Sequence, residues 1–156
     1  MLEIVVITIS DRAHAGQYAD RSGPEITAIL EAAEIDVAVH TDLVPDDPQA
    51  IRKTLEKWKG VDWIITTGGT GIGPRDITPE VTREFCERLL PGVAEMLRRE
   101  SCRETPYAVF SRGQCGISGN TLVVNFPGSV KAVRLSTRLI LPLLEHGPGM
   151  LRGESH

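Results

Sequence analysis

Residues 2–9 read LEIVVITI, an apolar and largely β-branched run with almost no alternation of polar and apolar side chains. A strand with one face in water alternates, whereas a strand that is covered on both faces does not. Sheets that are covered by helices on both faces are mainly parallel. This segment therefore restricts the chain to folds in which helices enclose a buried, mainly parallel sheet.

Strand and helix patterns alternate along the rest of the chain. Residues 35–44, 62–67 and 121–126 are expected to be strands. The expected helices begin at Pro24, follow Asp47, run from Thr78 through Leu89, cover residues 93–99 and cover residues 130–144. This order predicts an α/β fold of three layers, with a mainly parallel sheet and helices on both faces. Residues 106–118 fit neither pattern.

The length of the chain, 156 residues, suits one domain with a core of its own. We expect that domain over residues 1–146. A flexible C-terminal tail is expected over residues 147–156, which contain Gly147, Pro148, Gly149 and Gly153.

The charge balance argues against two classes of partner. A net charge of −4 provides no overall field that would attract nucleic acid or an anionic membrane. No apolar run approaches the roughly 20 residues of a membrane helix. We therefore expect a cytoplasmic protein with neither nucleic-acid nor membrane partners. The three cysteines, which lack metal-site spacing, are expected to be reduced thiols.

Ligands of open parallel sheets bind at the carboxyl ends of the strands, where helix N-termini with unpaired N–H groups collect. Four loops of this chain should meet at that edge. They are Ser10-Asp11-Arg12, Pro45-Asp46-Asp47, residues 68–76 and Asn125-Phe126-Pro127-Gly128-Ser129.

The loop Gly68-Gly69-Thr70-Gly71-Ile72-Gly73 is the most informative of these. Its four glycines would let the backbone approach a ligand closely and direct amides at phosphate oxygens. The loop is not a P-loop, because Pro74 stands where that motif requires lysine. The alternative is a plain turn that requires positive φ angles.

Asp46 and Asp76 are the candidate functional carboxylates, because neighbouring residues can cap the helices that follow. Asp47 precedes one helix and Thr78 begins another, so each is the expected cap. Two carboxylates beside a phosphate-binding loop repel a bare phosphate but accommodate Mg²⁺. The residues therefore predict a magnesium nucleotide at Asp46 and Asp76, with a purely capping role as the alternative.

Other residues near the expected site give weaker signals. Arg12, Arg75, Arg112 and Lys131 could neutralise an anion, although isolated basic residues are usually surface residues. Neither Ser111 nor Ser129 has an identifiable histidine base that would make it a nucleophile, and Ser129 is the expected cap of the last helix.

Six sequence blocks occur in a fixed order: Ser10-Asp11-Arg12; Asp20-Arg21-Ser22-Gly23-Pro24; Val44-Pro45-Asp46-Asp47; Thr67-Gly68-Gly69-Thr70-Gly71 with Pro74-Arg75-Asp76-Ile77-Thr78-Pro79-Glu80; Phe110-Ser111-Arg112; and Asn125-Phe126-Pro127-Gly128-Ser129. Together they resemble the MogA/MoaB family, which includes bacterial molybdopterin adenylyltransferase and the G domains of gephyrin and its plant counterpart. The resemblance extends from Ile4 to about Leu144.

This resemblance implies a three-layer MogA-like fold, usually a homotrimer and in some cases a hexamer, that binds molybdopterin and Mg-ATP. It implies transfer of AMP to the terminal phosphate of molybdopterin with release of pyrophosphate, and other molybdenum cofactor biosynthesis proteins as partners. Asp46 and Asp76 match the family's catalytic aspartates and would hold Mg²⁺. The implied binding residues are Ser10, Asp11, Ser22, Gly23, Gly68, Gly69, Thr70, Gly71, Ser111, Arg112, Asn125, Pro127, Gly128 and Ser129.

One departure keeps an alternative open. The chain leaves no room after Ser129 for the insertion that some bacterial MogA enzymes carry before the last helix, so its length is similar to MoaB. The alternative to an adenylyltransferase is a non-catalytic MoaB-like module that binds molybdopterin or serves as a scaffold. Both aspartates are present, which favours the enzyme.

Overall fold

The computed structural model describes residues 1–154 and contains one six-stranded sheet with the order β2-β1-β3-β6-β5-β4. Strand β1 (Leu2–Ile9) pairs in parallel with β2 (Val37–Val44) on one side and with β3 (Trp63–Thr67) on the other. Strand β6 (Thr121–Phe126) extends the parallel part of the sheet. The carboxyl ends of these four strands therefore lie at one edge.

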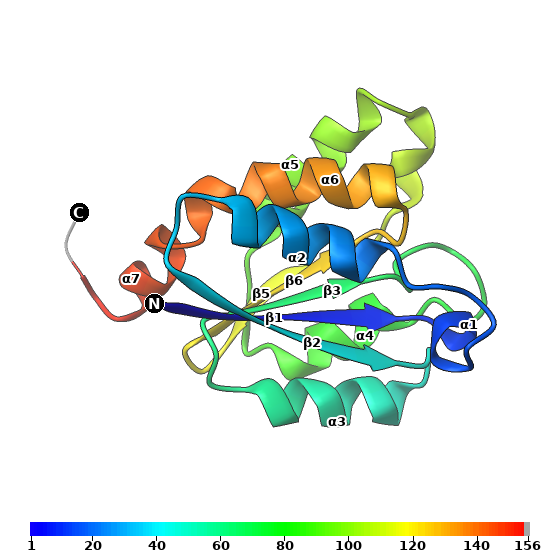
Figure 1. Ribbon diagram of the computed structural model, residues 1–156, viewed down its shortest axis with the longest axis horizontal. Helices are drawn as coiled ribbons and strands as arrows, with labels where there is room; N and C mark the ends of the chain where they lie inside the picture. Colours follow the sequence, from blue (N-terminus) through cyan, green and yellow to red (C-terminus); the bar gives the residue numbers. More distant parts are fainter. Residues whose placement is uncertain (155–156) are drawn as a thin grey trace.

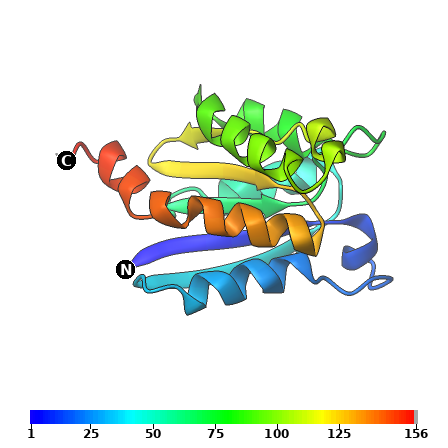
Figure 2. The same ribbon diagram turned by 90° about the horizontal axis from the view of Figure 1, so that it is seen from above.

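Helices cover both faces of this sheet, as Figure 1 shows. One face carries α2 (Ser22–Ala32), α5 (Pro91–Cys102) and α6 (Val130–Ile140), which lie beside one another in Figure 2. The other face carries α3 (Pro48–Trp58) and α4 (Thr78–Phe85). The predicted three-layer α/β fold is confirmed.

The side chains of β1 divide between two cores. Ile4 and Val6 pack in the cluster beneath α2 and α6, whereas Val5 and Ile7 pack in the cluster beneath α3 and α4. All four side chains are buried. Because successive side chains point to opposite faces, an uninterrupted apolar run supplies both cores, which explains why this strand does not alternate.

The segment without an expected assignment forms the antiparallel edge of the sheet. It contains the 3₁₀ helix η1 (Pro106–Phe110) and β5 (Cys115–Ser118), which pairs antiparallel with β6. Outside β5 lies β4 (Arg88–Leu89), so the expected continuation of a helix through Leu89 is wrong. Helix α4 ends at Phe85.

The end of the chain is more regular than expected. Helix α6 ends at Ile140 and is followed by η2 (Leu141–Leu143) and α7 (His146–Leu151). Residues 147–151 of the expected flexible tail are thus helical, and Pro148 and Gly149 are buried. Residues 155–156 of that expected tail lie outside the described residues. The Trp63 indole donates a hydrogen bond of 3.0 Å to the Leu144 carbonyl, which ties this end to the sheet.

The loops at the carboxyl edge include a short helix, α1 (Asp11–His14), directly after β1. The side chain of Ser10 caps it by accepting a hydrogen bond from the amide of Ala13.

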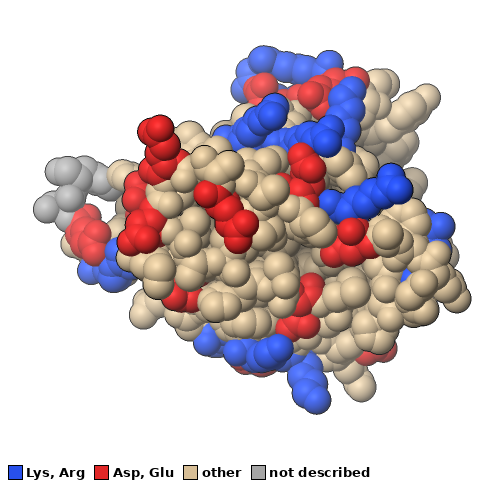
Figure 3. Space-filling view, viewed as in Figure 1, with Lys and Arg blue, Asp and Glu red and all other residues tan. Residues whose placement is uncertain are grey.

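On the face shown in Figure 3, acidic and basic side chains are interspersed over the surface. Within residues 1–154, no helix is both long and apolar enough to cross a bilayer.

Candidate functional site

Two cavities meet at the carboxyl edge of the sheet, with the glycine loop between them. The first, which we call the α5–α6 cavity, has a volume of about 440 Å³. The second, which we call the acidic cavity, has a volume of about 540 Å³ and is bounded by α1 and the ends of β1 and β3. The residues that line both are Gly68, Gly69, Asp76, Gly128 and Ser129.

The first two glycines of the loop are required by its geometry. Gly68 has φ +102°, and a Cβ there would lie 2.2 Å from the Ile9 carbonyl oxygen. Gly69 has φ +67°, and a Cβ there would lie 3.0 Å from Asp46 Oδ1. A side chain at either position would be strained and would collide with its neighbours, so this turn requires glycine at both positions.

The same loop also presents free donors. Among the described residues, no acceptor is bonded to the amides of Gly69, Thr70 and Gly71. Amides left unpaired next to a cavity can bind phosphate oxygens. The loop therefore meets a turn requirement and also offers an anion-binding backbone.

Thr78 has a different role from the expected cap. The N-cap of α4 is Ile77, which makes no side-chain capping bond. The hydroxyl of Thr78 donates instead to the Gly68 carbonyl at 3.0 Å, inside the protein. This bond fixes the entrance of the glycine loop against α4. Asp47, in contrast, caps α3 as predicted, accepting from the amide of Ala50 at 2.8 Å.

Asp46 is held by a reciprocal pair of hydrogen bonds with Asp11. The Asp11 amide donates to Asp46 Oδ2, and the Asp46 amide donates to Asp11 Oδ1, both at 3.0 Å. Arg75 donates to both Asp11 carboxylate oxygens, at 2.6 and 3.1 Å, and to the Asp46 carbonyl at 3.0 Å. The loops that follow β1, β2 and β3 are thereby joined.

These contacts shift the pKa values of the two aspartates in opposite directions. Hydrogen bonding to Arg75 lowers the pKa of Asp11. Burial raises the pKa of Asp46, and the nearby charges of Asp11 and Asp76 raise it further. The charge of Asp46 is thus poorly compensated by the protein, which is the environment that a bound cation would relieve.

Asp76 lies against the second half of the glycine loop. Its Oδ2 accepts from the Gly73 amide at 2.9 Å and lies 2.9 Å from the position that a Cβ on Gly71 would occupy. Arg112 holds this segment by donating to the carbonyls of Gly71 and Asp76, both at 2.7 Å, and by pairing with Glu80.

The residues present fit a magnesium ion shared with a substrate. Asp46 Oδ1 and Asp76 Oδ1 have no hydrogen-bonding partner among residues 1–154. Those residues contain no cluster of three or more metal-binding side chains. Mg²⁺ commonly takes one or two carboxylates and completes its shell with phosphate oxygens and water. Asp46 and Asp76 fit that requirement.

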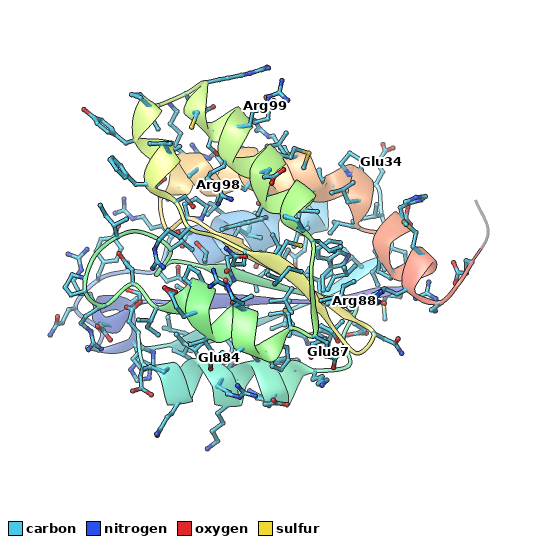
Figure 4. The ribbon with its side chains drawn as sticks, turned by 180° about the vertical axis from the view of Figure 1, so that it is seen from behind. Glu34, Glu84, Glu87, Arg88, Arg98 and Arg99 are labelled. Atoms are coloured by element: carbon cyan, nitrogen blue, oxygen red, sulfur yellow. The ribbon has the colours of Figure 1, made fainter. Side chains whose placement is uncertain are left out.

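Helices α5 and α6 contribute mostly small, uncharged side chains to the α5–α6 cavity. Helix α5 contributes Ala94, Leu97 and Ser101, and α6 contributes Ala132 and Ser136. Arg98 also lines this cavity, and Figure 4 shows it on the sheet-facing side of α5, whereas Arg99 points away. The Arg98 guanidinium donates to the carbonyls of residues 111 and 113 and so positions the segment after η1.

Asn125 lines the α5–α6 cavity but is fully engaged by the protein. Its amide nitrogen donates to the hydroxyls of Thr66 and Thr82, each at 2.9 Å, and its carbonyl oxygen accepts from the Gln114 amide at 3.1 Å. Asn125 therefore braces β6 against α4 beneath the site.

The structure gathers most of the sequence-predicted residues. The α5–α6 cavity includes Thr70, Gly71, Ser111, Asn125 and Pro127, and the acidic cavity includes Ser10, Asp11, Ser22 and Asp46. Two predicted binding residues line neither cavity. Arg112 is bonded beneath the loop, and a Cβ on Gly23 would lie 2.5 Å from the Thr8 hydroxyl.

Sequence reasoning missed the α5 wall and the acidic residue Asp20. Ala94, Leu97 and Ser101 recur at helical spacing, which is also the pattern of an ordinary core face. Asp20 accepts from the Thr8 hydroxyl at 2.7 Å and from the Gly23 amide at 3.1 Å, and it lines the acidic cavity. Its position in the block Asp20-Arg21-Ser22-Gly23-Pro24 was the available signal.

Comparisons with known proteins match this architecture. The family model described as "Probable molybdopterin binding domain" matches residues 5–146. A Helicobacter pylori protein named molybdopterin adenylyltransferase is 35% identical over 156 residues, which cover 97% of this chain and 89% of that protein. The Drosophila melanogaster protein named molybdenum cofactor synthesis protein cinnamon is 42% identical over 90% of this chain, which spans 24% of its length.

A solved structure gives the same result. The crystal structure of the molybdopterin biosynthesis enzyme MoaB from Thermus thermophilus superposes with a TM-score of 0.89 at 42% sequence identity. The match covers 98% of each chain. The likeness therefore extends over nearly the whole chain.

Proposed function

Because the chain belongs to the family of molybdopterin-binding domains, we propose that it is a molybdopterin adenylyltransferase of molybdenum cofactor biosynthesis. One observation carries the proposal. Asp76 lines both cavities and Asp46 lines the acidic cavity, and both adjoin the loop of free backbone amides between them. An adenylyl transfer needs two substrates that meet at one point, and this arrangement supplies two compartments with a common wall.

In the proposed reaction, an oxygen of the terminal phosphate of molybdopterin attacks the α-phosphorus of ATP. The bond between the α-phosphorus and the oxygen that bridges to the β-phosphate breaks, and pyrophosphate leaves with that oxygen. The nucleophile belongs to the substrate, so the protein needs no nucleophilic side chain. Its contribution is positioning and neutralisation of charge.

We assign ATP to the acidic cavity and molybdopterin to the α5–α6 cavity. Arg12 and Arg21 line the acidic cavity and form no ion pair with a described residue, so they are available to the triphosphate. Lys131 is similarly unpaired at the α5–α6 cavity and is available to the molybdopterin phosphate. The free amides of Gly69, Thr70 and Gly71 lie between the two.

Asp46 and Asp76 would hold Mg²⁺ against the phosphates. When bound, the ion supplies positive charge to the triphosphate and to the transition state. The reciprocal bonds with Asp11 fix the orientation of the Asp46 carboxylate, and the bond from Gly73 fixes that of Asp76. The two carboxylates therefore lose little conformational freedom when the nucleotide binds.

The test is direct. Purified protein that is given molybdopterin and Mg-ATP should release pyrophosphate and form a product heavier by one adenylyl group. No release above a protein-free control contradicts the proposal. Molybdopterin binding without release would identify the alternative, a non-catalytic MoaB-like module.

We also propose a cytoplasmic homotrimer. Tyr107, Val109 and Phe110 are exposed on η1 and offer apolar surface for contacts between copies. Light scattering at working concentration should give a trimeric mass. A monomeric mass contradicts this proposal, and a hexameric mass would indicate that two such trimers associate.

A further inference from the structure

A single residue holds the second half of the glycine loop and the segment that follows it. The Arg112 guanidinium donates through Nε to the Gly71 carbonyl and through Nη2 to the Asp76 carbonyl, both at 2.7 Å. The Arg112 backbone amide donates to the Thr70 carbonyl at 2.8 Å. Three carbonyls of one segment are therefore bonded to one residue, which lies 36 positions after Asp76 in the chain.

These bonds set the direction of the backbone donors in the loop. In a planar trans peptide, the carbonyl of one residue and the N–H of the next point in opposite directions. The bond to the Thr70 carbonyl thus turns the free amide of Gly71 away from Arg112. Thr70 and Gly71 both line the α5–α6 cavity. Arg112 therefore orients part of the backbone that is available to an anion.

The charge of Arg112 is compensated within the protein. Its Nη1 pairs with Glu80 in the first turn of α4, so each guanidinium nitrogen has an acceptor in the protein. Arg112 lines neither cavity. Lys131 differs in both respects, because it lines the α5–α6 cavity and pairs with no carboxylate among residues 1–154. Arg112 is thus placed to hold the loop, whereas Lys131 is placed to bind a ligand.

The Asp76 carboxylate depends on this support. Within the described part of the chain, its one hydrogen bond is the one that Oδ2 accepts from the Gly73 amide at 2.9 Å. The direction of the side chain therefore follows from where the Asp76 backbone lies, and Arg112 holds that backbone at its carbonyl. A displacement of about 1 Å at a reacting site can lower a rate by as much as ~10²-fold.

We propose that Arg112 is a positioning residue, which holds Asp76 and the loop amides in place for Mg-ATP and does not itself contact a substrate. This inference rests on the proposed function. It differs from the ligand-binding role that the family resemblance implies for Arg112. Glu80 is the counter-ion that keeps the guanidinium turned toward the loop.

The experiment is a double-mutant cycle between Arg112→Lys and Asp76→Asn in the full chain. Lysine keeps the charge, but its donors diverge from one nitrogen and cannot replace three bonds from a planar guanidinium. Arg112→Lys alone should lower kcat about tenfold and raise the Kd for Mg-ATP, measured by calorimetry, about 3- to 10-fold. The KM for molybdopterin should stay within twofold of wild type. In the Asp76→Asn background, both effects should fall below threefold, because the carboxylate that Arg112 positions is already absent.

Arg134→Lys is the matched control. Arg134 also pairs with a glutamate of another helix, Glu25 at 2.6 Å, and it lines neither cavity. This substitution should leave kcat and the Kd for Mg-ATP unchanged. If Arg112→Lys does not fold, Glu80→Ala takes its place, since it removes the counter-ion and keeps the guanidinium. It should show the same pattern at about threefold.

Three results would overturn the inference. A KM for molybdopterin that rises as much as kcat falls, with an effect that shrinks at high salt, would make Arg112 a ligand for phosphate. Equal factors in the two backgrounds would separate Arg112 from Asp76. A lowered melting temperature with unchanged kcat and Kd would leave Arg112 a purely structural role. If the wild type binds Mg-ATP without releasing pyrophosphate, the adenylyltransferase proposal fails while the cycle in Kd still tests Arg112.

Discussion

The two cavities on either side of the glycine loop are built from different parts of the fold. The acidic cavity is made by loops at the strand ends, and its carboxylates are fixed by hydrogen bonds that join one loop to the next. The α5–α6 cavity lies between the same glycine loop, η1 and the faces of α5 and α6, and its helical walls include small side chains such as Ala94, Ala132 and Ser136. We propose a division of labour on this basis, in which the loops carry the reacting charge and the helical walls contribute to the shape that selects a ligand.

The largest effect should come from removing the carboxylate charge on the loop side. Asp46→Asn and Asp76→Asn should each lower kcat by ~10²-fold or more, because charge neutralisation in the transition state is lost. Asparagine retains an oxygen that can accept the bond from Asp11 or Gly73, so the melting temperature should stay within about 2 °C of wild type. Pyrophosphate release and thermal melts check this.

The same variants test whether the two cavities act independently. If loops carry reactivity and helices carry shape, the Kd for molybdopterin should change by less than threefold in Asp46→Asn. A loss of molybdopterin binding as large as the loss of kcat would break the distinction, since both cavities would then act as one site.

On the helical side, Lys131→Met should affect binding more than turnover. Removal of an unpaired cation beside the cavity should raise the KM for molybdopterin about tenfold, or ~1.4 kcal/mol, and leave kcat within threefold. The increase should shrink at high salt. Arg138→Met is the control, because it removes the same charge from α6 at a residue that lines neither cavity. Equal effects of the two substitutions would show that the increase in KM comes from the change in net charge and not from the position of Lys131.

Arg75 connects the loops of the acidic cavity, so it should act through Asp11 and Asp46. Arg75→Gln removes the paired bonds to Asp11 and should lower kcat by roughly three- to tenfold. The Mg²⁺ concentration for half-maximal rate should rise, which a loss of stability alone would not produce. Arg83→Gln, on the last turn of α4, is the control and should leave both values unchanged.

The loops were more predictable from sequence than the helical cavity. Asp46, Asp76 and the glycine loop could be placed together because parallel strands end at one edge and because Asp47 was a sufficient cap for α3. Ala94, Ser101 and Ser136 could not be placed, since small residues at helical spacing look the same in a core as in a cavity wall. A core face and a cavity wall differ only in how closely α5 and α6 pack in the folded protein.

Two further expectations from the sequence differ from the structure because tertiary contacts override local sequence patterns. Thr78 was expected to cap α4, but its hydroxyl reaches the Gly68 carbonyl instead. The glycines near the C-terminus indicated a loose tail, yet a Cβ on Gly147 would lie 2.7 Å from Leu122. That glycine permits close packing against the sheet, so in this segment glycine indicates proximity and not freedom.

A smaller effect, on stability alone, should follow from Asp47→Ala. The side chain caps α3 through the Ala50 amide and is exposed outside both cavities. Its loss should cost about 1 kcal/mol, or 2–4 °C in melting temperature for a chain of this size, with kcat unchanged. A large loss of kcat in Asp47→Ala together with an active Asp46→Asn would reverse the assignment of the two neighbouring aspartates.

The smallest effect concerns the pH dependence of stability in Asp46→Asn. Burial and the neighbouring acidic groups raise the pKa of Asp46 in the folded protein above its unfolded value of 3.8. A raised pKa favours folding of the protonated form, so this stabilisation is complete below pH 3.8 and disappears as the pH rises through the folded pKa. Asparagine is neutral at every pH and avoids the unfavourable charge. The variant should therefore melt above wild type at pH 7, and the difference should close as the pH falls toward 3.8. A variant that melts below wild type at pH 7 would show that the Asp46 charge is already compensated within the loops, and the acidic cavity would then need no cation.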